Sequence, residues 1–448
     1  MATSIFNQTE KGLFNLNMQQ KLNIVNQLIS DTKIPRMIKI RQKFSEQAVD
    51  DIQNEVRRQL GCREICEKIR PGMEIAITAG SRGIANIAVI IREVCSIVKE
   101  NGATPFIVPA MGSHGGATAE GQRRLIEGYG ITEGFCGAEI RSSMEVKHIG
   151  NTADGRPVSI DRNAAEADGI IVIGRIKAHT DFRGRYESGL MKMMVIGLGK
   201  QKGAESFHAA GTKHYAEQLP LYGTTILNNA PVLFGLGIIE NAYDQTAKLV
   251  ALLPQEIIDK EPELLVEAKA LMGKLLFDNC DLLIVDRIGK DISGEGMDAN
   301  VTGRFATKYA SGGIEAETLA VLSLTKESHG AFVGLGMADV TTRRVLDEAD
   351  FDASYANTLT STILLPSRLP LVMDSDRQAI QACLKYCGGI DHDNPRVIRI
   401  IDTMHLGEIL ISEAMLAEAL KNPNIEVLSE PFEMPFDDNG ALQDIGKI

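Results

Sequence analysis

Between residues 75 and 128 the chain repeats one order of elements: a short apolar run, a glycine-rich loop and a helical pattern. The apolar runs 75–78 and 105–109 each end in such a loop, and helical periodicity follows at 84–100 and 119–128. A strand that leads through a short loop into a helix, and then into another strand, is the unit of a parallel, doubly wound sheet. This order therefore predicts an α/β fold.

The chain is long enough for two domains, because its 448 residues exceed what one ordinary core accommodates. A long helical pattern with several acidic residues covers 254–276, and we place the domain boundary near its end. We therefore expect an N-terminal α/β domain over residues 1–272 and a C-terminal α/β domain over residues 273–448, both with largely parallel sheets.

Further elements are predicted from apolar runs and periodicity. In the first domain we expect strands at 37–40, 169–173, 231–239 and 247–253, helices at 49–69 and 254–276, and a hairpin over 146–161. In the second we expect strands at 280–286 and 397–401, further apolar runs at 318–324, 330–337 and 369–373, and helices at 341–347, 354–364, 377–387 and 411–420.

The overall charge is acidic: the formal net charge is −12 and the isoelectric point is near 5.3. Such a balance argues against nucleic acid and against an anionic membrane surface as partners. The first 20 residues lack the pattern of a signal peptide, and no apolar stretch reaches the ~18 residues that span a bilayer. Seven cysteines without a paired framework fit thiols in a reducing compartment. We expect a cytoplasmic protein.

A basic segment interrupts this acidic chain between Gly174 and Gly203. It holds seven basic side chains against two acidic ones: Arg175, Lys177, Arg183, Arg185, Lys192, Lys200 and Lys202 against Asp181 and Glu187. It starts where the apolar run 169–173 ends, and open α/β sheets bind ligands at the carboxyl ends of their strands. Seven charges alone would fit a solvated loop, but Lys192 lies among methionines, which solvated loops seldom contain. The segment predicts an anion site.

Three of the predicted loops each carry one candidate functional side chain, namely Arg82, His114 and His179. A single arginine or histidine after a strand is commonly a cap or a salt-bridge partner. Three such side chains, each in the loop that follows a predicted strand, indicate a site, because these loops converge at one edge of a doubly wound sheet. His208 follows in the basic segment, and an imidazole near cations is held neutral, which is the form that binds a metal.

The glycine-rich loops contain neither standard nucleotide fingerprint. The loop at Gly112 and Ser113, before a helix, can still offer backbone amides to a phosphate. Cys383 and Cys387 lie one helical turn apart without further ligands at zinc spacing, so we expect core thiols there.

Five separated motifs occur in order in the predicted first domain: Gly80-Ser81-Arg82, Met111-Gly112-Ser113-His114, Lys177-Ala178-His179, Ser188-Gly189-Leu190-Met191-Lys192, and His208. Together they resemble the nickel-pincer lactate racemase family and its 2-hydroxy-acid racemase and epimerase relatives. The resemblance implies two α/β domains with an active-site cleft between them. It also implies a nickel pyridinium bisthiocarboxylic acid mononucleotide cofactor, which separate enzymes make.

The resemblance assigns the acid/base roles to His114 and His179, on opposite faces of the substrate carbon. One removes the hydroxyl proton while hydride passes to the pincer, and the other serves the opposite enantiomer. Imidazole suits this symmetric task because its pKa lies near neutrality. Arg82 would hold the substrate carboxylate, for which a bidentate guanidinium is suited.

The resemblance also assigns the cofactor contacts. Lys192 matches the lysine that tethers the cofactor, and His208 matches the protein ligand of nickel. Gly112 and Ser113 would contact the cofactor through their backbone. Lys290, in the first loop of the second domain, would be a further anion contact with the substrate.

The chain departs from the family pattern in the longer interval from His179 to Lys192, in Leu190 and Met191 before the lysine, and in Ser81 before the arginine. Two further departures bear on the substrate. The chain has no tryptophan, so the second-domain tryptophan of the lactate enzyme is absent. Arg183 and Arg185 are extra. They would either bind a second carboxylate or a sugar acid, or form salt bridges to Asp181 and Glu187.

The leading hypothesis is an isomerase that racemises or epimerises a 2-hydroxy acid by reversible hydride transfer. The alternatives are a nicotinamide-dependent 2-hydroxy-acid oxidoreductase and a non-catalytic protein that binds anionic metabolites. The expected partners are a small-molecule 2-hydroxy acid and the cofactor-synthesis enzymes, with no nucleic acid and no membrane. The sequence is compatible with an oligomer.

Overall fold

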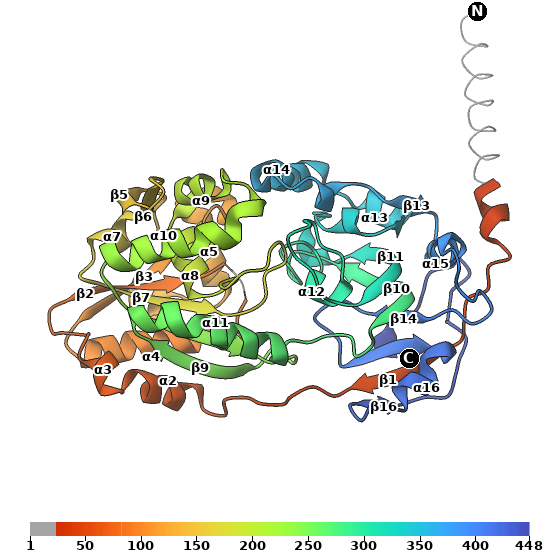
Figure 1. The fold of residues 1–448 in the computed structure, drawn as a ribbon, viewed down its shortest axis with the longest axis horizontal. Coiled ribbons are helices and arrows are strands. Elements are labelled where there is room, and N and C mark those ends of the chain that lie inside the picture. The colour runs from red at the N-terminus through yellow and green to blue at the C-terminus, as the bar shows by residue number, and fades with distance from the viewer. Residues whose placement is uncertain (1–23, 82, 448) are drawn as a thin grey trace, which may run out of the picture. The chain divides into compact units, whose positions relative to one another are not determined.

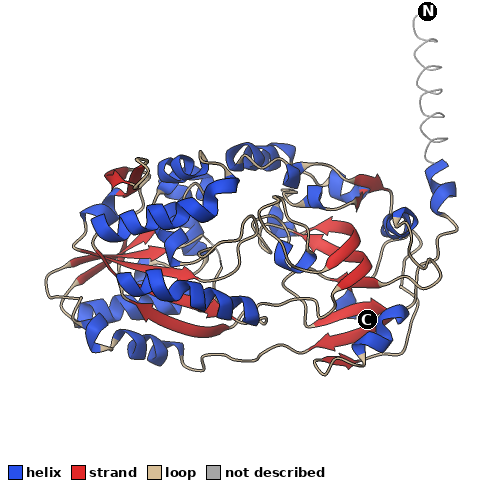
Figure 2. Ribbon diagram, in the orientation of Figure 1, coloured by secondary structure: helices blue, strands red, loops and turns tan. Residues whose placement is uncertain are grey.

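The structure is a computed structural model that describes residues 24–81 and 83–447 (Figures 1 and 2). The chain divides into two compact units, each built on one large sheet. The six-stranded unit comprises residues 44–274 and 307–311, and the eight-stranded unit comprises residues 24–43, 275–306 and 312–447. Both units are α/β with largely parallel sheets, which confirms the predicted fold class.

The sheet of the six-stranded unit has the order β4-β3-β2-β7-β8-β9. Its strands are β2 (Glu74–Ala79), β3 (Thr104–Pro109), β4 (Glu139–Ile140), β7 (Gly169–Arg175), β8 (Val232–Glu240) and β9 (Thr246–Leu252). The first five strands in this order are parallel, and β9 is antiparallel to β8. The predicted hairpin is present as β5 (Val146–Asn151) and β6 (Pro157–Asp161).

Helices cover both faces of this sheet, which is why its strands are continuous apolar runs. In β7, Ile171 and Ile173 lie in one core with α2 and α4, whereas Ile170 and Val172 lie in a second core with α10 and α11. The longer helices are α2 (Ile52–Leu60), α4 (Ile87–Glu100), α5 (Ala119–Gly128), α9 (Lys200–His208), α10 (Tyr215–Asn229) and α11 (Pro254–Leu271); the short ones are α3 (Arg63–Cys66), α6 (Glu133–Cys136), α7 (Arg162–Glu166) and α8 (Leu190–Lys192).

The sheet of the eight-stranded unit has the order β13-β12-β11-β10-β14-β15-β1-β16. Its strands are β1 (Met37–Gln42), β10 (Asn279–Ile288), β11 (Glu315–Leu324), β12 (Val340–Thr342), β13 (Leu371–Met373), β14 (Val397–Ile400), β15 (Glu408–Ser412) and β16 (Ile425–Val427). Its helices are α12 (Ala299–Thr302), α13 (Arg343–Asp347), α14 (Phe351–Ser361), α15 (Asp376–Tyr386) and α16 (Leu416–Ala419). Among the described residues of the whole chain, no helix has the length and apolar character needed to cross a membrane.

The two units differ from the predicted domains 1–272 and 273–448 at the N-terminal end. β1 pairs with β15 on one side and with β16 on the other, both antiparallel, so residues 24–43 fold with the C-terminal half. Residues 307–311 join the other unit, where the Arg183 N–H donates to the carbonyl of Tyr309 (2.9 Å). Pairing between strands far apart in sequence leaves no local sequence pattern.

The helix predicted at 411–420 begins too early and is shorter than expected. Ile411 lies in β15, paired with Ile38 of β1 and Ile398 of β14, and the helical part is a 3₁₀ turn, η7 (Glu413–Met415), followed by α16 (Leu416–Ala419). A short apolar run fits a buried strand and a buried helix equally well, and here cross-strand pairing decides. The prediction also contained no helix at α10, where Pro220 lies inside the helix.

We predict that Ile38→Ala, in β1, destabilises the eight-stranded unit. Ile38 is fully buried opposite Ile411, so the cavity should lower the free energy of unfolding by about 2–5 kcal/mol. Hydrogen exchange should accelerate in β14 and β15, whereas the matched variant Ile77→Ala, in β2, should act on β3 and β7. Faster exchange in β2 and β7 of the Ile38→Ala protein would contradict the assignment of β1.

Candidate functional site

Three neighbouring parallel strands, β3, β2 and β7, end at one edge of the six-stranded sheet. The loops after them carry His114, Ser81 and His179, respectively. Arg82, predicted to bind the substrate carboxylate, lies outside the described residues and stays a prediction. The strand order therefore brings the two predicted histidine loops to either side of the Ser81 loop, as expected at the carboxyl edge of such a sheet.

The chain from Leu190 to His208 packs against these loops. It consists of α8, a π-helical turn η2 (Met193–Gly197) and α9. The Gly112 N–H donates to the carbonyl of Gly197 (3.1 Å). Gly112 has φ +60°, and a Cβ there would lie 3.2 Å from the carbonyl oxygen of Ile196, so glycine allows this approach. π-helical turns are frequent at functional sites, and this one lies between Lys192 and His208.

His179 contacts Lys192 directly. The His179 Nε2 lies 2.6 Å from Lys192 Nζ, and the Asp181 backbone N–H donates to His179 Nδ1 (3.0 Å). Burial, and then the charges of Lys192, Lys177, Arg183 and His208, hold the pKa of His179 well below 6.5. An imidazolium would direct both its N–H groups at other N–H donors. His179 is therefore neutral, the form that accepts a proton.

A buried carboxylate fixes the backbone of His179. Glu187 Oε2 accepts the His179 N–H (2.7 Å), and Glu187 Oε1 accepts from Lys269 Nζ (2.6 Å). Arg183 Nη1 donates to the carbonyl of His179 (2.6 Å) and lies 3.4 Å from Glu187 Oε2. Arg183 thus forms the salt bridge to Glu187 that the sequence left as one alternative, whereas Arg185 donates to the carbonyl of Ile258 (3.1 Å).

His208, at the end of α9, shares its electrostatic environment with His179 and Lys192. Its ring stacks on Tyr215, with centroids 5.4 Å apart. Burial, followed by the charge of Lys192, lowers the pKa of His208 to about 4, while Asp181 opposes the shift. A neutral imidazole offers a nitrogen lone pair to a metal. We call these three residues, His179, Lys192 and His208, the histidine–lysine cluster.

His114 lies on the surface at the start of a 3₁₀ turn, η1 (Gly115–Ala117). Its Nδ1 lies 2.5 Å from Ser81 Oγ, and the Tyr129 hydroxyl donates to the carbonyl of Ser81 (2.9 Å). The loops after β2 and β3 are therefore linked by side chains. Gly112 and Ser113 precede His114 in the same loop.

Lys290 belongs to the eight-stranded unit, in the turn that follows β10, and is half-buried. Its predicted contact with a substrate, and the predicted cleft between domains, stay predictions. Cys383 and Cys387 are buried, as expected of core thiols.

Glu261 is a residue that the sequence analysis missed. It lies in α11, almost fully buried, and its Oε2 accepts the N–H of Met191 (3.1 Å). A Cβ at Gly189 would collide with Glu261 Oε1, so the carboxyl sits directly against the turn that carries Lys192. The available signal was its position on the apolar face of α11, in register with Ile257 and Leu264.

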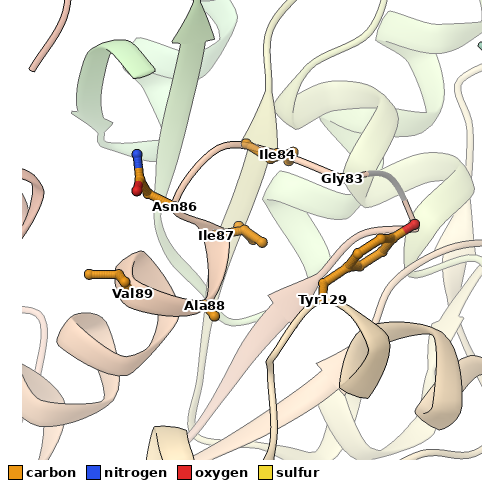
Figure 3. Close-up of a pocket in the computed structure, with 7 residues that line it drawn as sticks. All are labelled: Gly83, Ile84, Asn86, Ile87, Ala88, Val89 and Tyr129. Carbon is orange, nitrogen blue, oxygen red and sulfur yellow. The ribbon is translucent and has the colours of Figure 1, made fainter. Parts of the chain in front are cut away.

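A cavity of about 180 Å³ lies beside the Ser81 loop, at the start of α4 (Figure 3). Its lining is Gly83, Ile84, Asn86, Ile87, Ala88, Val89 and Tyr129. The lining is mainly apolar and includes none of the predicted site residues. Tyr129 connects it to the site through Ser81.

The described residues contain no group of three or more His, Cys, Asp or Glu side chains that could hold a metal ion. The histidine–lysine cluster offers two neutral imidazoles, of which His208 is the predicted metal ligand, together with the nitrogen of Lys192.

The fold and these contacts define an α/β protein that gathers histidines and cations at the carboxyl edge of one sheet. Residues 22–219 match the lactate racemase N-terminal domain. This match confirms the resemblance to the lactate racemase family seen in the motifs. Among solved structures, the lactate racemase apoprotein from Thermoanaerobacterium thermosaccharolyticum matches with a TM-score of 0.48 and 13% identity, over 83% of this chain and 99% of that one. A search of curated proteins found no match.

We predict that Lys192→Met raises the pKa of both His179 and His208. The charge of Lys192 lowers both values, so its removal should move them towards 6.5, while burial keeps them below it. Titration of the imidazole ring protons by NMR measures this. Lys213→Met removes an exposed lysine as a control and should leave both values in place. Unchanged pKa values in Lys192→Met would contradict the cluster.

We further predict that Glu261 makes stability depend on pH. Burial raises its pKa from 4.5 to about 8, and hydrogen bonds from the Met191 and Leu190 N–H groups partly oppose this. Between pH 4.5 and about 8, the folded chain therefore binds more protons at Glu261 than the unfolded chain. The free energy of unfolding should therefore fall with rising pH, by at most about 1.4 kcal/mol per unit. Urea unfolding of Glu261→Gln should lack this component between pH 5 and 8, and equal slopes for both proteins would refute it.

Proposed function

We propose that the chain is an isomerase of the lactate racemase type, which racemises or epimerises a 2-hydroxy acid. The observation that carries the proposal is the 2.6 Å contact between His179 Nε2 and Lys192 Nζ, within a region that matches the lactate racemase N-terminal domain. A buried neutral imidazole beside a lysine suits proton transfer to and from an anionic substrate. We also propose that the protein works in the cytoplasm and receives its cofactor from separate synthesis enzymes.

The residues fit the nickel-pincer nucleotide implied by the family. Lys192 would tether it, His208 would ligate nickel as a neutral imidazole, and Gly112 and Ser113 would contact it through their backbone. When bound, the cofactor supplies a reversible hydride acceptor. The supporting observations are the low pKa of His208 and the close approach of the Gly112 loop to the π-helical turn that follows Lys192.

The chain's own acid/base groups would be His179 and His114. His179, in its neutral form, would accept the hydroxyl proton of one enantiomer or return it. His114 would do the same for the other enantiomer, with Nδ1 held by Ser81 and Nε2 directed to the substrate. Arg82 would orient the carboxylate, and Lys290 would add a further anion contact. The buried Glu187 and Arg183 would keep His179 in place.

The prediction that tests this function uses protein produced together with the cofactor-synthesis enzymes. It should interconvert the enantiomers of a 2-hydroxy acid, with D- and L-lactate as the first probes, without added nicotinamide. With 2-deuterated substrate in ordinary water, the deuterium should stay at C2 in both enantiomers, since hydride transfer does not exchange with solvent. Chiral chromatography with mass detection measures both quantities.

His179→Ala should lower kcat by about 10²–10⁴-fold, the usual contribution of a general acid or base. Lys213→Met should leave kcat unchanged. Loss of the label to solvent would contradict hydride transfer, and turnover only with added nicotinamide would indicate the oxidoreductase. Binding of hydroxy acids without any interconversion would indicate a non-catalytic binding protein.

A further inference from the structure

One buried side-chain amide, that of Gln122, hydrogen-bonds the backbone of the loop that bears His114. Gln122, in α5, is fully buried, and its Nε2 donates to the carbonyls of Gly112 (2.8 Å) and His114 (3.2 Å). Two backbone carbonyls of one loop therefore share one side-chain donor. The position of His114 relative to the sheet thus depends on where this amide is held.

A buried lysine holds that amide. Lys200 Nζ donates to Gln122 Oε1 (2.9 Å) and to the carbonyl of Pro109 (2.5 Å), the last residue of β3. It lies 3.3 Å from Asp161 Oδ2, and both side chains of this ion pair are fully buried. Three oxygens thus surround the three protons of one ammonium group. Lys200 thus contacts Pro109, where the His114 loop begins, directly, and it contacts the carbonyl of His114 through Gln122.

Lys200 also lies at the middle of the segment that carries the histidine–lysine cluster. It is the first residue of α9, eight residues after Lys192 and eight before His208. Its backbone has φ +53°, which an L-residue other than glycine rarely adopts. Asp161 reaches the same segment, because its N–H donates to the carbonyl of Leu198 (2.7 Å).

A buried ion pair is a poor way to gain stability, because an apolar pair of similar volume usually does as well or better. Burial lowers the pKa of Lys200, and Asp161 opposes that shift. Lys200 thus combines a buried ammonium group with a left-handed backbone, and both are costly. Their occurrence at one residue indicates that the side chain has a role beyond filling space in the core.

We propose that Lys200 is a positioning residue that fixes the His114 loop, through Gln122 and Pro109, against the segment that carries Lys192 and His208. The inference rests on the proposed function, in which His114 and His179 act on opposite faces of one carbon. Acid and base groups of this kind must be held within about 0.5 Å of their productive geometry. One side chain would thus set the spacing between the two histidines.

Two variants test whether Lys200 fixes the His114 loop, and neither leaves Lys200 or Asp161 buried without the other. Gln122→Met removes the amide that links Lys200 to the loop. The double variant Lys200→Met with Asp161→Asn removes both members of the ion pair together, and Lys213→Met is the control. Amide hydrogen exchange is measured on the protein without cofactor, and kcat and KM on protein made with the cofactor-synthesis enzymes.

Both variants should accelerate exchange at residues 110–117 by about tenfold or more, with β2 and β7 unchanged. In the loaded enzyme kcat should fall about 10²-fold, because a misplacement of 1 Å costs that much. KM should stay within about threefold, since substrate binding does not need the histidine in register. A purely structural role would instead accelerate exchange throughout the unit.

Unchanged exchange at residues 110–117 in both variants would overturn the proposal, as would full kcat in both. Loaded wild-type protein that interconverts no hydroxy acid would refute the proposed function. The exchange measurement would still decide whether Lys200 fixes the loop, so the two failures are distinguishable.

Discussion

The candidate site depends on one contact, in which the buried imidazole of His179 meets the nitrogen of Lys192 at 2.6 Å. The Asp181 N–H donates to the other ring nitrogen, and burial together with the charge of Lys192 disfavours an imidazolium. His179 is therefore kept as a base at neutral pH, whereas an exposed histidine would be partly protonated. The same lysine lowers the pKa of His208, so one side chain keeps two imidazoles available.

Three buried ionisable side chains hydrogen-bond the backbone of the segments that carry the predicted site residues. Glu187 accepts the N–H of His179, Glu261 accepts the N–H of Met191, and Lys200 donates to the carbonyl of Pro109. Burial disfavours the charged form of such groups, and it raises the pKa of Glu261 to about 8, so this carboxyl is mostly protonated near neutral pH. Buried ionisable groups are a poor source of stability, so their contacts with this backbone point to a role in fixing its geometry.

The sequence predicted the α/β fold and the loops that carry His114 and His179, because buried strands leave short apolar runs and helices leave a period of 3.6 residues. Glu261 was not predicted as a site residue, and Lys200 was predicted only as one cation of the basic segment. Their partners lie far along the chain, and only packing brings them together. The same reason explains β1 and β15, whose place in the sheet depends on pairing between the two ends of the chain.

Native mass spectrometry of the protein produced with the cofactor-synthesis enzymes tests most directly whether the histidine–lysine cluster binds the nickel cofactor. We expect one nickel-containing mass increment per chain in the wild type and in Lys213→Met. We expect no increment in the double variant Lys192→Met with His208→Ala. An increment that survives in the double variant, or one that never forms in the wild type, would show that the cluster does not bind the nickel cofactor.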